Sequence, residues 1–199
     1  MSLSDEDGQI LVKMARLVVT RYLQNGERVE LPNEFKSKFS FKSGIFVTLN
    51  KEKHLRGCIG FPTPNKNLHQ SLVDAAIASS TEDPRFPPVK HEELDKITFE
   101  ITVLTPPIEI KVNDFSEYPK MIKIGRDGLI IKSEYGTGLL LPQVPVEYGW
   151  NEKEFLSYTC EKAGAPANYW EQKSAIISKF EGIVFKEVKP NGPIKRMEL

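Results

Sequence analysis

Residues 55–60, LRGCIG, hold the side chains best suited to chemistry. If this segment is a β-strand, Arg56 and Cys58 share one face, while Leu55 and Ile59 point the other way into the core. Along such a strand Arg56 and Cys58 lie about 7 Å apart, and a guanidinium at this range favours the nucleophilic thiolate. We therefore expect Cys58 to contact or attack a substrate and Arg56 to bind an anionic group.

The glycines of this segment add to that expectation. Gly57 and Gly60 flank the cysteine, and a residue without a side chain lets a ligand approach the main chain closely. The sequence also allows a structural interpretation, in which Cys58 is a small buried apolar residue and Arg56 is a surface or ion-pair residue. Exposure of the thiol decides between the two interpretations.

A second polar position lies on the segment 97–104, which alternates apolar and polar residues as a half-buried strand does. Glu100 falls on its polar side between two threonines. It is a candidate general base, or a partner for Arg56. The alternative is a solvated charge on an exposed sheet face.

Two further stretches offer ligand-binding side chains. Asp83 and Arg85 lie in the segment 81–91, whose three prolines exclude a helix or a central strand. Stiffening of this kind suits a binding loop, and an internal Asp–Arg clasp that shapes the loop is the alternative. Gln143 follows a leucine run and a proline, so we expect its amide to have a fixed hydrogen-bonding role, either structural or facing a ligand.

Four segments together resemble the AMMECR domain family. They occur in the family's order and cover nearly the whole chain: LRGCIG at 55–60, DPRFPP at 83–88, GLLLPQV at 138–144, and Phe155-Leu156 with Cys160-x-Lys162-Ala163-Gly164. Ala165-Pro166 departs from the bulkier apolar residue expected there. The resemblance implies an α+β fold of two packed parts with mostly antiparallel sheets and a groove between them. It also implies the role of protein A in AmmeMemoRadiSam-type systems, with radical-SAM and Memo-like proteins as partners, and it carries no settled activity.

Composition narrows the function classes. The 199 residues contain 27 basic and 27 acidic side chains, so net charge does not indicate nucleic-acid binding, and only a local basic stripe would revive that hypothesis. The start of the chain lacks signal-peptide features, and no run reaches the ~20 apolar residues of a membrane span, which favours a cytoplasmic protein. We expect no metal site, because the two cysteines form no Cys-x-x-Cys and the three histidines lack metal-like spacing. We also expect no cofactor, because the sequence contains neither a phosphate loop nor a dinucleotide fingerprint.

The elements that must position these residues follow from periodicity and capping signals. We expect a helix from Ser4 to Asn25, a β-hairpin over 44–59 and a helix from about residue 67. A similar hairpin over 128–141 and a helix over 152–162 suggest a loose internal repeat, for which chance similarity is the alternative. We expect a loop over 142–150 and a final strand over 176–188 that is interrupted at Gly182.

These elements predict two α+β subdomains of one domain, 1–112 with the LRGCIG motif and a smaller 113–199, with a boundary that allows a discontinuous unit.

Three functions remain open at this stage. The first is a small-ligand site or enzyme in a groove built from charged and thiol side chains: Arg56, Cys58, Asp83, Arg85 and Glu100. The second is an adapter that docks partner proteins through an aromatic patch made by Phe61, Phe86 and Trp150. The third, nucleic-acid association, is the weakest because of the zero net charge.

Overall fold

The computed structural model describes residues 3–197 and has an α+β fold of helices and antiparallel strands. The chain divides into two compact units. Unit 1 runs to Leu104 and takes up the chain again at Ile183, and unit 2 is Thr105–Gly182. The sequence predicts a boundary between residues 112 and 113, whereas the structure divides the chain after Leu104 and makes unit 1 discontinuous. No helix among the described residues is long and apolar enough to cross a membrane.

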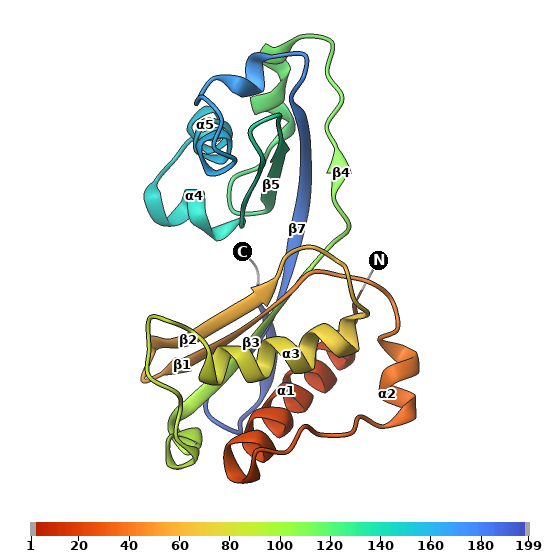
Figure 1. Cartoon of the computed structure of the whole chain (residues 1–199), viewed down its shortest axis with the longest axis vertical. Coiled ribbons are helices and arrows are strands. Elements are labelled where there is room, and N and C mark those ends of the chain that lie inside the picture. Colours follow the sequence, from red (N-terminus) through yellow and green to blue (C-terminus); the bar gives the residue numbers. More distant parts are fainter. Residues whose placement is uncertain (1–2, 198–199) are drawn as a thin grey trace. The chain divides into compact units, whose positions relative to one another are not determined.

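Unit 1 is a sheet covered on one face by two helices, with strand order β2-β1-β3-β7-β8. Figure 1 shows α1 and α3 side by side across this sheet. Its elements are α1 (Asp5–Asn25), α2 (Asn33–Lys38), β1 (Ile45–Lys51), β2 (His54–Phe61), α3 (Leu68–Thr81), η1 (His91–Lys96), β3 (Ile97–Leu104) and β8 (Ile194–Met197), with the second part of β7 (Ile176–Glu187).

The first helix begins and ends as the sequence predicts. The Ser4 hydroxyl accepts a hydrogen bond from the Asp7 amide while the Asp7 carboxylate accepts one from the Ser4 amide, which is a capping box. Gly26 ends the helix at φ 73°, a left-handed conformation that glycine adopts without strain. The predicted hairpin, the strand over 97–104 and the helix after Asn67 are also confirmed.

One hydrophobic core lies between the helices and the sheet of unit 1. Alternate strand residues are fully buried there, including Val47, Leu49, Phe99 and Ile101. Within this core a salt bridge links α1 to β7: Arg16 Nε donates to Glu187 Oε1 at 2.7 Å, and Glu187 also accepts from the Phe99 amide. Because a buried carboxylate needs such partners, this pair fixes the register between β3 and β7.

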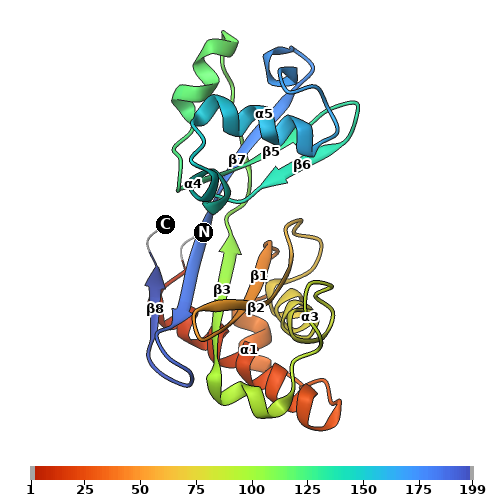
Figure 2. The same cartoon turned by 90° about the vertical axis from the view of Figure 1, so that its left-hand side faces the viewer.

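Unit 2 repeats the hairpin-plus-helix arrangement, with α5 packed on β5 and β6 (Figure 2). Its elements are β4 (Ile108–Glu109), η2 (Phe115–Met121), β5 (Asp127–Lys132), β6 (Thr137–Leu140), α4 (Gln143–Tyr148), α5 (Glu152–Lys162), η3 (Tyr169–Glu171) and the first part of β7. Two predictions are wrong here. The expected loop over 142–150 contains α4, and β7 passes through Gly182 without interruption.

Candidate functional site

The LRGCIG strand contains a β-bulge at its arginine. Leu49 of β1 pairs with Gly57 and Asn50 with Leu55, so Arg56 is the extra residue of the pair of strands. The prediction that Arg56 and Cys58 share one face by simple alternation is therefore wrong. Leu55, expected in the core, is 39% exposed, and Ile59 is half-buried.

Arg56 is fully occupied by internal partners. Its guanidinium donates to both carboxylate oxygens of Glu93, at 3.2 and 2.9 Å, and to the carbonyls of Pro87 and Pro88, at 2.9 and 3.3 Å. The hydrogen bond from Arg56 lowers the pKa of Glu93 to about 2. Arg56 therefore anchors the 83–88 loop and the start of η1 to β2.

Asp83 and Arg85 form a clasp on the free edge of the same strand. The Cys58 amide donates to Asp83 Oδ2 at 2.8 Å, and the Cys58 carbonyl accepts from Arg85 at 3.3 Å. Arg85 also donates to the buried Asp83 carboxylate, and this hydrogen bond holds the pKa of Asp83 well below its usual range. Because β2 ends the strand order, the clasp satisfies main-chain groups that an edge strand would leave unpaired.

Cys58 itself is a partly buried thiol. Its Sγ lies 3.2 Å from Thr48 Oγ1, whose hydroxyl donates toward it. Burial raises the pKa of Cys58, and the cation that opposes this rise is Arg85. The expected activation of the thiolate by Arg56 is therefore not present.

A polar row crosses the sheet at the position of Cys58. In the strand register Cys58 pairs with Thr48, and Thr48 pairs with Glu100. Lys186 of β7 extends the row, because its Nζ lies 3.1 Å from Glu100 Oε2. The alternating buried residues of β1 and β3 face α1 and α3, so the row lies on the opposite face. We call this opposite side the polar face.

The glycine and the glutamine proposed as ligand-binding residues lie elsewhere. Gly57 is buried against α3, and a Cβ there would come within 2.1 Å of the Ser79 carbonyl, so its missing side chain lets the helix pack on the strand. Gln143 is the half-buried first residue of α4 and belongs to unit 2. Trp150 of the predicted aromatic patch also belongs to unit 2, whereas Phe61 and Phe86, the other members of the patch, belong to unit 1.

A cavity of 470 Å³ adjoins the polar row. Asn50 and Thr98 line it, each two residues along its strand from a member of the row, and Lys186 belongs to both. The remaining lining residues come from the β1–β2 turn, the end of η1, the end of β7 and the segment after it: Glu52, Lys53, Lys96, Glu187, Val188, Lys189 and Pro190. Sequence reasoning missed Thr48, Asn50 and Thr98, although alternation within residues 45–50 and 97–104 places them with Glu100. Lys186 carried no local signal.

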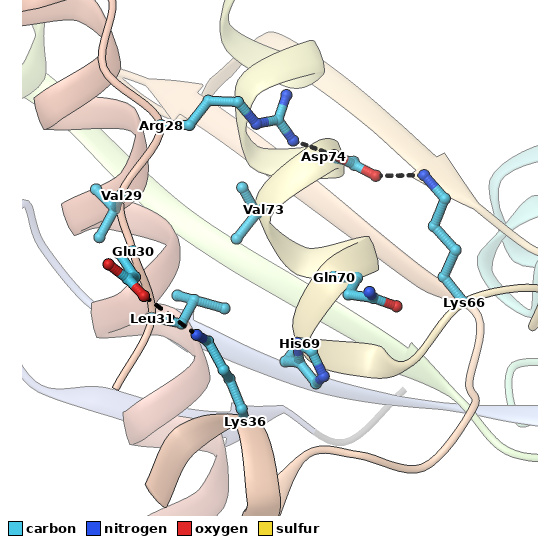
Figure 3. A pocket seen from close by; sticks show the side chains of 10 residues that line it. All are labelled: Arg28, Val29, Glu30, Leu31, Lys36, Lys66, His69, Gln70, Val73 and Asp74. Carbon is cyan, nitrogen blue, oxygen red and sulfur yellow. Dashed lines mark hydrogen bonds and ion pairs between the residues drawn. The ribbon is translucent and has the colours of Figure 1, made fainter. Parts of the chain in front are cut away.

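A second cavity of unit 1, of 380 Å³, is lined by three basic side chains that all have carboxylate partners (Figure 3). Asp74 of α3 forms ion pairs with both Arg28 and Lys66, and Lys36 pairs with Glu30. Burial lowers the pKa of His69 at the rim. Across residues 3–197 no group of three or more His, Cys, Asp or Glu side chains is arranged to hold a metal ion.

Comparison with known proteins confirms the family resemblance over almost the full chain. The family model described as AMMECR1 matches residues 12–185. Protein PH0010 from Pyrococcus horikoshii is 48% identical, with 99% of this chain and 98% of that protein covered. Protein MK0488 from Methanopyrus kandleri is 45% identical, with 98% and 95% covered. The crystal structure of PH0010, described as uncharacterized, matches with a TM-score of 0.87 over 99% of both chains.

Proposed function

The chain belongs to the AMMECR1 family, and we propose that it binds a small polar molecule, without covalent catalysis, on the polar face of the unit 1 sheet. The observation that carries this proposal is the 470 Å³ cavity that adjoins the row Cys58–Thr48–Glu100–Lys186. Its volume falls within the range of roughly 300–1,000 Å³ that is typical of small-molecule sites.

The row and the lining of the neighbouring cavity supply hydrogen-bonding groups of several kinds. Thr48 offers a hydroxyl, Glu100 a carboxylate, Lys186 an ammonium group and Asn50 an amide. Thr48, Asn50 and Glu100 are half-buried rather than fully solvated, so hydrogen bonds to a ligand there compete with less water. Together with Lys186 they stand on three neighbouring strands, β1, β3 and β7, and rigid elements hold binding groups more accurately than loops do.

Binding is favoured over catalysis because the thiol is poorly activated. Burial raises the pKa of Cys58, so its thiolate fraction at neutral pH is smaller than that of a free cysteine. Arg56 and Asp83 serve the loop and the strand edge instead. Glu100, proposed as a general base, is the ion-pair partner of Lys186, which suits a role in holding a ligand.

Ligand-observed NMR against a library of polar metabolites tests the binding proposal. We expect bound compounds to weaken about tenfold in Thr48→Val or Glu100→Gln, since each change removes a hydrogen-bonding group. Thr137→Val and Glu92→Gln alter exposed residues of the same types and serve as matched controls. Compounds that bind all four variants equally would place the site elsewhere.

Alkylation of the thiol tests the absence of covalent catalysis. In a Cys160→Ser background, iodoacetamide should label native Cys58 at pH 7.5 at least about tenfold more slowly than it labels the unfolded chain. Cys160 is removed first because it is the other free cysteine, fully buried, with its pKa raised to about 11 by burial. Labelling of native Cys58 faster than the unfolded thiol would indicate an activated nucleophile and contradict the proposal.

An aromatic stack in unit 2 favours a second candidate function, docking of a partner protein. Trp150 stacks between Tyr148 and Tyr158, with ring centroids 5.0 and 4.0 Å apart, and Tyr148 is 68% exposed. Exposed aromatic groups of this kind are common at protein interfaces. The family resemblance makes radical-SAM and Memo-like proteins the partners to test.

Calorimetric titration of the full chain with purified radical-SAM and Memo-like proteins tests this second function. Tyr148→Ala and Tyr158→Ala should weaken complex formation about tenfold or more. Tyr135→Ala changes an exposed tyrosine outside the stack and is the matched control. Equal affinity of all three variants would remove the stack from the interface.

A further inference from the structure

We infer that the cavity beside the polar row is a phosphate-binding site, and that its ligand is a phosphate-bearing small molecule. The inference rests on the proposed function, because it assigns a ligand class to the same cavity. It is drawn from the charges that line the cavity, from the backbone of a neighbouring turn and from the packing of one lysine.

The lining has an excess of positive charge. Four lysines, Lys53, Lys96, Lys186 and Lys189, line the cavity together with two glutamates. Glu187 is committed to Arg16 in the core, and Lys186 pairs with Glu100. That leaves three lysines and Glu52, an excess of two positive charges.

These three lysines are not neutralised within the protein. No ion pair formed among residues 3–197 involves Lys53, Lys96 or Lys189. The other cavity of the same unit is the internal comparison, because Arg28, Lys36 and Lys66 there all have carboxylate partners. An anion with two or more charges is therefore better matched by the lysine cavity.

The backbone of the β1–β2 turn is held in an unfavourable conformation at the cavity. Lys51 pairs with His54, so Glu52 and Lys53 are the two central residues of the turn, at φ 53° and 69°. A two-residue turn with both φ positive strongly prefers Asn-Gly, and left-handed backbone costs an ordinary residue about 1 kcal/mol or more. Such strain concentrates at functional sites, and here it holds Lys53 on the rim of the cavity.

The position of Lys189 depends on a glycine in the other bordering turn. A Cβ at Gly192 would lie 2.4 Å from Lys189 Cγ, and the Gly192 amide donates to the Lys189 carbonyl. The stem of Lys189 thus passes over the glycine instead of extending freely. A fixed lysine loses less side-chain entropy on binding than a free one.

The lining favours a small molecule over nucleic acid. The lysines surround a concave cavity, whereas single-stranded nucleic acid is usually held by a groove in which bases stack on aromatic side chains. The lining residues that the structure describes include no aromatic side chain. Ammonium groups supply the charge for a phosphate, while Asn50 and Thr98 supply neutral hydrogen-bonding groups for the rest of the ligand.

Isothermal titration calorimetry of the full chain with pyrophosphate and tripolyphosphate tests the inference. We expect binding that is about tenfold weaker in Lys96→Ala and in Lys189→Ala. Lys13→Ala and Lys153→Ala make the same change in net charge at exposed lysines outside the cavity, and they should bind like the native chain. Equal weakening in all four variants would mean diffuse attraction and would overturn the inference.

A turn variant separates folding from binding. Glu52→Asn with Lys53→Gly should relax the turn, so that the protein becomes more stable while tripolyphosphate affinity falls about tenfold. Glu52→Asn alone keeps the lysine and should keep the affinity. A double variant that is more stable and binds tripolyphosphate as well as the native chain would contradict a role for Lys53.

Two other outcomes also overturn the inference. Binding of a single-stranded oligonucleotide without binding of tripolyphosphate would mark the lysines as a nucleic-acid surface. A metabolite whose affinity falls in the Thr48 and Glu100 variants but not in the variants of the three lysines would refute the phosphate assignment. The proposed function would still stand. Failure of the proposed function is distinct, because then no compound responds to Thr48→Val or Glu100→Gln.

Discussion

Two charged regions of unit 1 use their charges in opposite ways. At the edge of β2, the charged side chains form hydrogen bonds with one another and with main-chain groups: Arg56, Asp83, Arg85 and Glu93. At the cavity beside the polar row, Lys53 of the β1–β2 turn, Lys96 of η1 and Lys189 after β7 have no carboxylate partner among residues 3–197. The first arrangement holds the 83–88 loop against β2, and the second leaves positive charge available to bind a ligand.

The difference indicates which region is maintained for folding and which for binding. Paired charges with main-chain partners stabilise the folded chain, because removing one leaves a buried group unsatisfied. Like charges gathered beside a strained turn lower stability. A region that lowers stability is a better candidate for function than one that raises it. The LRGCIG strand is then chiefly a structural element, with its functional contribution limited to the side chain of Cys58.

The largest expected effect is at the clasp. Asp83→Ala removes the acceptor of the Cys58 amide and the partner of Arg85, so the free energy of unfolding should fall by about 3 kcal/mol. Urea denaturation measures this loss. Asp83→Asn keeps one acceptor oxygen and should lose less, whereas Lys96→Ala should change stability by under ~0.5 kcal/mol. Equal losses at the clasp and the cavity would erase the distinction between the two regions.

The next effect is a dependence on pH that belongs to the clasp region and not to the lysine cavity. The pKa of Glu93 is lowered from 4.5 to about 2 in the folded chain, chiefly by Arg56, and that of Asp83 is also lowered, chiefly by Arg85. A carboxylate with a lowered folded pKa stabilises above its ordinary pKa and loses that contribution as the pH falls through the folded value. Between about pH 5 and 2, Glu93 should account for roughly 2 kcal/mol of lost stability.

Denaturation of the Arg56→Ala variant across this pH range isolates the contribution of Glu93. The variant should be less stable at neutral pH and should lose less stability on acidification, because its Glu93 pKa is closer to the ordinary value. Lys189→Ala, in the other region, should lose as much stability on acidification as the native chain does. Parallel pH curves for Arg56→Ala and the native chain would show that Arg56 does not set the Glu93 pKa.

Local signals were enough for most of the fold, whereas the site depended on pairing between distant strands. The capping boxes at Ser4 and Asn151 mark where α1 and α5 begin. The bulge at Arg56 has no mark within LRGCIG, because it is defined by which residues of β1 oppose it. Lys186 likewise joins Glu100 only through the order of strands.

The missed helix α4 has a local explanation. Pro142 is its N-cap and Pro145 lies in its first turn, where amides have no partner within the helix, so proline is tolerated there although it argues against a helix interior. The six-residue α2 over Asn33–Lys38 is too short to show helical periodicity. The error at α4 comes from applying a rule for long helices to a helix of six residues.

The β1–β2 turn should show a smaller effect of the opposite sign. Glu52→Asn with Lys53→Gly replaces two residues at positive φ with the pair that this turn prefers, so the free energy of unfolding should rise by about 1 kcal/mol. Thermal denaturation at fixed pH and salt measures the gain. A loss of stability would mean that Glu52 and Lys53 stabilise the hairpin through contacts, and the turn would then no longer count as strained for function.

The smallest effect is expected where charges are paired but exposed. Lys66 pairs with Asp74 at 2.7 Å in the second cavity, but its side chain is 61% exposed. Solvent-exposed pairs contribute little, and Arg28 remains as a partner for Asp74, so Lys66→Ala should cost at most about 0.5 kcal/mol. Its tripolyphosphate affinity should equal that of the native chain, because the lysine lines the cavity in which every lysine and arginine has a carboxylate partner. If Lys66→Ala weakens tripolyphosphate binding as much as Lys189→Ala, neutralisation by carboxylates does not distinguish the two cavities, and the argument from unpaired charge fails.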